Sequence, residues 1–475
     1  MNHSTTSSER PIAVAVDIGT TKVCALAGRL DDYGKLEILA ISRVESEGIL
    51  RGVVSNIEKT VSAIDRAIRI IEQRLGKRVH TIHVGIAGQH VKSMQHRGSR
   101  MRENAELEIS QDDIQNLIND MHRLHLPAGD KIIHVIPQEY TIDNEPGIVD
   151  PVGMSGVRLE GQFHIVTGQL MAINNIRRCI EKVNLQLRDL TLEPLASGAS
   201  VLSDEEKEAG VALVDIGGGT TDLAIYFENV ARHIAVIPFG SNSITKDIKE
   251  GCHVMQNQAE KMKVKFGHAI AREVRDDKII TIPGLKGRDN KEISQRNLSL
   301  IIQARIEEIF DYIMWEIKKS GYENKLTGGI VVTGGGSMMR DIEKLISYHT
   351  GFSARRGLPT EHLAHGYHES IADPAYATVL GLLYSAASVI RESEVENVAP
   401  RVRQAEVEVE IVNQEVSTHA YTERRQSGRH ASPEREVESS VPEVPVNNEP
   451  KESLMNRILS KAREYFEAAD DDDLK

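Results

Sequence analysis

Two short turns in this sequence carry the residue types that hold phosphate. They read Asp17-Ile18-Gly19-Thr20-Thr21-Lys22 and Asp215-Ile216-Gly217-Gly218-Gly219-Thr220. Glycine lets backbone N–H groups approach an anion, and threonine hydroxyls add donors. Lys22 adds a positive charge, while Asp17 and Asp215 can hold Mg²⁺ through its water ligands, because this ion dehydrates reluctantly. Two such turns facing each other would clamp the β- and γ-phosphates of a nucleotide from both sides.

The elements around both turns follow one pattern, an apolar strand before the turn and another after it. The predicted strands are Ile12–Val16 and Val23–Ala27, then Val211–Val214 and Asp222–Phe227. This return of the pattern predicts an internal repeat and two related halves. Either turn alone could be an ordinary β-hairpin with glycine at positive φ. The chain has no G-x-x-x-x-G-K-[ST] motif and no G-x-G-x-x-G after its first strand, so a P-loop and a dinucleotide fold are excluded.

Length and composition narrow the class of protein. With 475 residues we expect about three domains, and 57 basic against 70 acidic side chains argue against nucleic-acid binding. The three cysteines lack metal or disulfide spacing, which favours a reducing cytosol. The N-terminus carries no signal-peptide pattern, and the longest apolar stretch, 377–390, is too short to span a bilayer.

The C-terminal part changes character. From Arg391 to Pro450 glycine nearly vanishes and the apolar residues follow neither a helical nor a strand period. This pattern predicts a disordered linker over 391–450. Residues 451–475 regain a helical period, which predicts an amphipathic helix in the membrane interface with basic residues at anionic headgroups. Docking into a protein groove is the alternative, and the acidic run Asp470–Asp473 would weaken lipid binding. The apolar face of this helix would consist of Leu454, Met455, Ile458, Leu459, Tyr465 and Phe466.

The two turns, together with Val332-Thr333-Gly334-Gly335-Gly336-Ser337, resemble the phosphate-1, phosphate-2 and adenosine motifs of the actin/Hsp70/sugar-kinase ATPases. The resemblance implies ATP and Mg²⁺ as ligands and an α/β, actin-like two-lobed fold. It places Glu260 and Lys263 near the ribose. Along the adenosine it places Gly334, Gly335, Gly336, Ser337 and Met338.

A segment between the two halves narrows the resemblance. Residues 134–140 (HVIPQEY) and 150–159 (DPVGMSGVRL) are similar to the small α+β, SHS2-type insert of the bacterial cell-division FtsA family. The resemblance covers roughly residues 11–390. It implies a protein that polymerises into actin-like filaments on the inner face of the cytoplasmic membrane at the division septum. There it would tether the tubulin-like protein FtsZ through residues 241–305 and meet other division proteins.

This resemblance predicts the following domains. The first lobe takes 11–83, 166–205 and the closing helix 361–390; the insert takes 84–165; the second lobe takes 206–240, an outer subdomain 241–305, and 306–360; the linker is 391–450 and the membrane helix 451–475.

Whether the chain hydrolyses ATP depends on one carboxylate. Glu193, in the stretch LEPLAS, occupies the region where this superfamily often orients the attacking water. An ordinary acidic residue at a helix start before Pro194 explains it equally well. FtsA-like proteins bind ATP more clearly than they turn it over. An Hsp70- or sugar-kinase-like ATPase enzyme is the alternative function.

Overall fold

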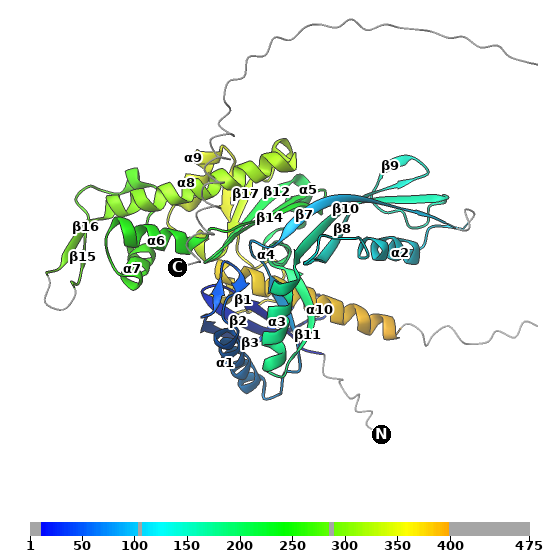
Figure 1. Cartoon of the computed structure of the whole chain (residues 1–475), viewed down its shortest axis with the longest axis horizontal. Coiled ribbons are helices and arrows are strands. Elements are labelled where there is room, and N and C mark those ends of the chain that lie inside the picture. The colour runs from blue at the N-terminus through cyan, green and yellow to red at the C-terminus, as the bar shows by residue number, and fades with distance from the viewer. Residues whose placement is uncertain (1–10, 103–106, 285–288, 399–475) are drawn as a thin grey trace, which may run out of the picture. The chain divides into compact units, whose positions relative to one another are not determined.

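The computed structural model describes residues 11–102, 107–284 and 289–398 of the 475-residue chain. Two five-stranded sheets within it share one layout (Figure 1), with strand orders β11-β6-β1-β2-β3 and β14-β13-β12-β17-β18. In each sheet the strand before the glycine-rich turn pairs antiparallel with the next strand and parallel with a later one. The internal repeat is therefore confirmed. The first sheet contains β1 (Ala13–Ile18), β2 (Lys22–Leu30), β3 (Leu36–Glu45), β6 (Thr81–Ile86) and β11 (Gln186–Leu192), and the second contains β12 (Val211–Ile216), β13 (Thr221–Phe227), β14 (Val230–Ile237), β17 (Ile330–Thr333) and β18 (Ala354–Arg356).

Helices cover both faces of the first sheet, which is why β1 reads as a continuous apolar run. Val14 and Val16 share a core with α1 (Ile57–Leu75) and α3 (Leu170–Lys182), whereas Ala13 and Ala15 share one with α10 (Ala377–Val398). The α1 helix begins after Asn56, whose side chain accepts a hydrogen bond from the Lys59 N–H, and ends at Gly76 in the left-handed conformation. A short hairpin, β4 (Ile49–Leu50) and β5 (Val53–Val54), precedes it.

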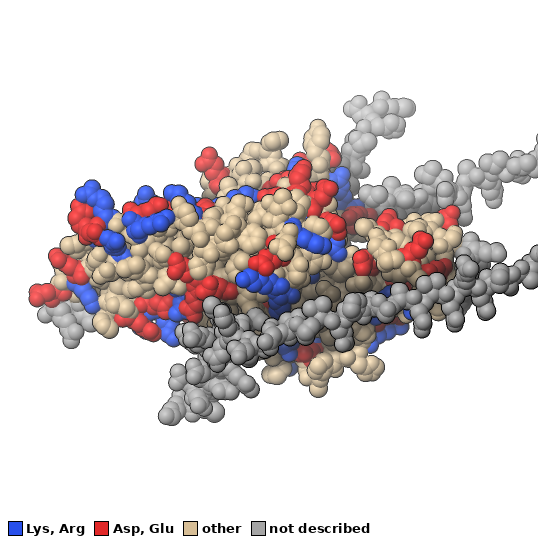
Figure 2. Space-filling model, turned by 90° about the horizontal axis from the view of Figure 1, so that it is seen from above, with Lys and Arg blue, Asp and Glu red and all other residues tan. Residues whose placement is uncertain are grey.

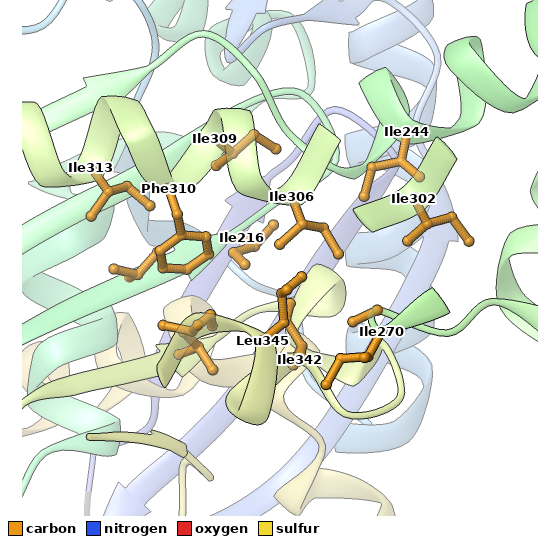
Figure 3. Packing of buried hydrophobic residues seen from close by; sticks show 14 of the residues in the cluster. Ile216, Ile244, Ile270, Ile302, Ile306, Ile309, Phe310, Ile313, Ile342 and Leu345 are labelled. Atoms are coloured by element: carbon orange, nitrogen blue, oxygen red, sulfur yellow. The ribbon is translucent and has the colours of Figure 1, made fainter. Parts of the chain in front are cut away.

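The second sheet is covered in the same way. On one face, Ile306 and Phe310 of α8 (Gln295–Ser320) pack in one cluster with Ile216 and with α9 (Ile342–Thr350), as Figure 3 shows. On the other face lies α4 (Glu193–Val201), which is followed by the short α5 (Asp204–Ala209).

Helices α4 and α10 cross at very short range. A Cβ on Gly381 would overlap the carbonyl oxygen of Ala196, so only glycine permits this approach. Because α10 packs on the first sheet and α4 on the second, the crossing joins the two halves.

Two smaller units extend the halves. The insert is an antiparallel sheet of order β7-β10-β8-β9 with its own core, built from β7 (Lys92–Met101), β8 (Asp130–Ile142), β9 (Glu145–Ile148), β10 (Arg158–Gln169) and α2 (Gln111–Met121). The outer part of the second half contains α6 (Ser241–Gly251), α7 (Gln256–Phe266) and the hairpin β15 (Ile279–Ile282) and β16 (Lys291–Ser294). Helix α8 runs on without a break through residue 305, where the sequence suggested a domain edge.

One boundary prediction is wrong. Helix α10 continues to Val398, so the linker does not begin at 391. The composition changes at Arg391 because the helix leaves the core there, and Arg391, Glu392 and Ser393 are exposed. The rest of the predicted linker, and the amphipathic helix with Leu454, Met455, Ile458, Leu459, Tyr465 and Phe466, lie outside the described residues.

The surface mixes the two signs of charge. On the face shown in Figure 2, Lys and Arg side chains alternate with Asp and Glu side chains. All three cysteines are buried and free. Within the described ranges, none of the helices combines the length and apolarity needed to cross a membrane.

Candidate nucleotide site

The two glycine-rich turns lie directly against each other. An ideal Cβ placed on Gly218 would come 2.5 Å from the Thr21 Cγ2, and one on Gly219 would come 2.6 Å from the Thr20 Oγ1. Any side chain at these two glycines would push the turns apart. The structure thus brings together the turns that the sequence predicted to face each other, and glycine makes the approach possible.

Two aspartates lie at the base of the turns. Asp17 and Asp215 are 5% and 7% exposed. Burial raises the pKa of Asp17 to about 6. The positive charge of Lys22 lowers this pKa, and the negative charge of Asp215 raises it by a smaller amount. Burial also raises the pKa of Asp215, although the Ser197 hydroxyl and Lys22 oppose it.

Helices α4 and α10 both hold the Asp215 side chain. The Ser197 hydroxyl donates to Asp215 Oδ2 at 2.7 Å, and the Thr378 hydroxyl donates to the same oxygen at 3.2 Å. The two hydroxyls are themselves 3.2 Å apart. The crossing of α4 and α10 therefore fixes one of the candidate Mg²⁺ residues.

Glu193 joins the aspartates from the first turn of α4. Burial, helped by the charges of Asp17, Asp222 and Asp215, raises the pKa of Glu193 well above its ordinary value. The side chain is half-buried, and its Oε1 would lie 3.2 Å from a Cβ on Gly85 in β6. Glu193 is thus both the acidic residue at a helix start and a member of the site, so the two sequence interpretations do not exclude each other.

Asp222 is the member of this group that the sequence analysis missed. It lies opposite Asp215 in the β12–β13 register, and burial, then Asp215 and Asp17, raise its pKa well above the ordinary value. Its Oδ1 is buried without a hydrogen-bond partner in the part of the chain described. The signal was present in the sequence: two aspartates flanking a tight turn at equal distance from it must pair across the hairpin.

These four carboxylates influence one another electrostatically, and the charge of Lys22 acts on Asp17, Glu193 and Asp215. Unpaired buried negative charge is costly, and the orphaned oxygen of Asp222 adds an acceptor with no donor. Carboxylate oxygens are the ligands Mg²⁺ prefers, and this ion is usually held through its own water ligands rather than by a tight protein cage. Asp17 and Asp215 are of the right chemical type for that role, while the side chains described do not form a closed metal cage here.

Lys22 has its own contacts within the protein. Its amine donates a hydrogen bond to the Ala375 carbonyl, just before α10, and lies 5.2 Å from the centre of the Tyr376 ring. Its charge still acts on Asp17 and Asp215. In this state Lys22 ties the first turn to the start of α10.

The third glycine-rich turn packs against the second one. Gly334 has φ 79°, and a Cβ there would overlap the Asp215 carboxylate. A Cβ on Gly336 would overlap the Ile216 side chain, whereas Gly335 has open space around it. Ser337 is buried and donates to the Gly334 carbonyl at 2.8 Å, so it supports the turn from inside; Met338 is 53% exposed.

The two predicted ribose residues lie on α7. The Lys263 amine contacts Thr245 Oγ1 at 2.8 Å, the Ser241 carbonyl at 3.0 Å and Glu260 Oε2 at 2.8 Å. Burial lowers the pKa of Lys263, which Glu260 opposes. Lys263 and Glu260 thus join α6 to α7 through Thr245, and their contact with a ribose stays a prediction.

Solved structures of similar fold come from several bacterial systems. The PilM–PilN type IV pilus biogenesis complex matches with a TM-score of 0.58 at 14% identity, covering 80% of this chain and 99% of that one. MreB5 of Spiroplasma citri bound to ADP matches with a TM-score of 0.50 at 14% identity, covering 81% and 98%. These neighbours confirm the predicted actin-like fold.

Sequence comparison gives the family. The family model described as cell division protein FtsA matches residues 212–381, and the model of the SHS2 domain inserted in FtsA matches residues 88–167. The cell division protein FtsA of Pseudomonas aeruginosa is 39% identical over 371 residues, or 78% of this chain and 88% of the relative. That of Escherichia coli K12 is 32% identical over 387 residues, or 80% and 91%. The chain belongs to the FtsA family of cell-division proteins.

Proposed function

We propose that the chain binds ATP with Mg²⁺ between its two phosphate turns. Gly19, Thr20 and Thr21 would donate from one side, and Gly217–Thr220 from the other, with Asp17 and Asp215 holding the ion through water. The contact of Thr20 and Thr21 with Gly218 and Gly219 carries this proposal, because it brings both donor sets to one place. The ADP held by MreB5, a protein of the same fold, supports it.

ATP turnover would be slow in this site. Mg²⁺ would neutralise charge on the phosphates, and Glu193 would orient the attacking water. Burial, then the charges of Asp17, Asp222 and Asp215, raise the pKa of Glu193, which favours the protonated side chain and weakens it as a base. A Glu193→Gln variant would therefore bind ATP almost as well as the wild type. Its hydrolysis rate would fall only from an already low value.

The division role would follow from nucleotide-dependent assembly. We propose that the ATP-bound protein forms actin-like filaments on the inner face of the cytoplasmic membrane at the septum. The C-terminal segment 451–475 would bind lipid, and the acidic run Asp470–Asp473 would keep each single contact weak. Polymerisation would then supply the avidity, and the filament would tether FtsZ and other division proteins.

Co-sedimentation with liposomes tests this function. The full chain and a truncation ending at Pro450 are compared with and without ATP, using vesicles that contain anionic lipid. We expect ATP-dependent pelleting of the full chain and none of the truncation, and we expect FtsZ polymers to pellet with the full chain. Equal behaviour of the two chains, with neither bound, would rule out the anchor and leave the segment as a protein-docking helix.

A further inference from the structure

The β4–β5 hairpin has an arginine at an unusual backbone position. Its two turn residues, Arg51 and Gly52, have φ values of 48° and 76°. Positive φ at both central residues defines the tight hairpin turn that selects Asn, Asp or Gly. Two other two-residue turns in the described chain have this geometry, Asp143-Asn144 and Glu228-Asn229. Arg51 therefore occupies a place where its long side chain brings no conformational benefit.

The tip of this hairpin lies among the phosphate-binding elements. The Gly52 N–H donates to Thr20 Oγ1 at 3.4 Å, and a Cβ on Gly219 would lie 3.1 Å from both the N and the Cα of Arg51. A Cβ on Gly52 would lie 2.8 Å from the Ala87 carbonyl oxygen, just after β6. The hairpin thus contacts the first turn, the second turn and the end of a neighbouring parallel strand, the edge where ligands of such sheets bind.

The guanidinium group of Arg51 has no partner among the described residues. Arg51 is half-buried, and no residue in the ranges the structure describes forms a hydrogen bond or ion pair with its side chain. The nearby lysine, Lys22, is hydrogen-bonded to the Ala375 carbonyl. A guanidinium suits a phosphate group, because its planar N–H donors match two phosphate oxygens at once.

We propose that Arg51 binds the terminal phosphate of the nucleotide, so that the β4–β5 hairpin distinguishes a nucleoside triphosphate from a diphosphate. The proposal rests on the nucleotide binding proposed above and assigns it a further residue. The hairpin contacts both turns, so a γ-phosphate would draw Thr20, Arg51 and Gly219 onto one ligand. With a diphosphate, Arg51 would again have no partner.

The test replaces the guanidinium and keeps the turn. Asn favours positive φ, so Arg51→Asn should fold. As a control, Glu228→Asn makes a change at the same backbone position of the two-residue turn between β13 and β14, where it also removes the ion pair with Arg232. Binding of Mg–ATP and Mg–ADP to the full-length variants is measured with fluorescent nucleotide analogues. Arg51→Gly repeats the test with a residue that accepts this φ without strain.

We expect Arg51→Asn and Arg51→Gly to weaken ATP binding at least about 10-fold while ADP binding changes by less than about 3-fold. Glu228→Asn should change neither. Arg51→Lys should recover part of the ATP affinity, because it restores the charge without the planar fork. Equal losses for both nucleotides, or no loss, would overturn the assignment of Arg51. A wild-type chain that binds neither nucleotide would instead overturn the nucleotide function itself.

Discussion

Replacing Gly381 by alanine should destabilise the protein at the crossing of α4 and α10. The new Cβ would overlap the Ala196 carbonyl oxygen and lie 3.0 Å from the Ala196 Cα. Both atoms belong to backbone, so no side-chain rotation can relieve the overlap and the helices must separate. Overpacking costs about 1–3 kcal/mol and more where backbone must move, while alanine returns about 1 kcal/mol of helix propensity. We expect a net loss of about 2 kcal/mol or more in the free energy of unfolding.

Circular dichroism at a fixed scan rate measures this effect as a lower Tm. A loss of about 2 kcal/mol should lower Tm by roughly 2–3 °C in a compact unit of about 400 residues, because the unfolding entropy grows with chain length. Gly251→Ala in α6 is the matched control, because its Cβ meets only the end of the flexible Ile301 side chain. Nucleotide binding should weaken too, because the same crossing brings the Ser197 and Thr378 hydroxyls to Asp215. A Gly381→Ala protein with the Tm of the wild type would refute the packing argument.

Three further predictions concern the site. Burial raises the pKa of Asp17, so this carboxyl keeps its proton to a higher pH in the folded state than in the unfolded state. The free energy of unfolding therefore falls as pH rises from 3.8 to about 6. In urea unfolding without nucleotide, Asp17→Asn should therefore be the more stable protein above pH 6, by at most about 3 kcal/mol, and should match the wild type below pH 3.8. Asp222→Asn should raise Tm without Mg²⁺, since the amide removes a carboxyl whose charged form is disfavoured by burial and by Asp215, and it should reduce the further rise that Mg–ATP produces; an unchanged Tm without Mg²⁺ would contradict this. Gly218→Val should force Thr21 away and abolish ATP binding in a fluorescence titration, whereas Gly251→Ala in α6, whose Cβ would meet only the Ile301 side chain, should bind as the wild type does.

Much of the fold followed from local pattern. The apolar runs around Asp17 and Asp215 predicted the two strand–turn–strand units, which the structure has as β1–β2 and β12–β13. These features depend on neighbours in sequence, which is why they could be read from it. The end of α10 could not, because the sequence after Ile390 carries no apolar period.

The partners of individual side chains depended on distant segments. Lys22 bonds to Ala375, and Lys263 contacts Ser241, Thr245 and Glu260, partners that the motifs alone do not indicate. A polar side chain forms its hydrogen bonds with the groups that the fold brings near it, and the distance between residues far apart in the sequence cannot be read from the sequence.

The sequence by itself determined the residue types at the phosphate turns, the repeat that duplicates them and the family to which the chain belongs. Only the tertiary structure decided that Thr20 and Thr21 meet Gly218 and Gly219, and that Arg51 joins them from a separate hairpin. The reason is physical: a turn's chemistry comes from its own residues, but a site that binds from two sides exists only where packing brings two turns together.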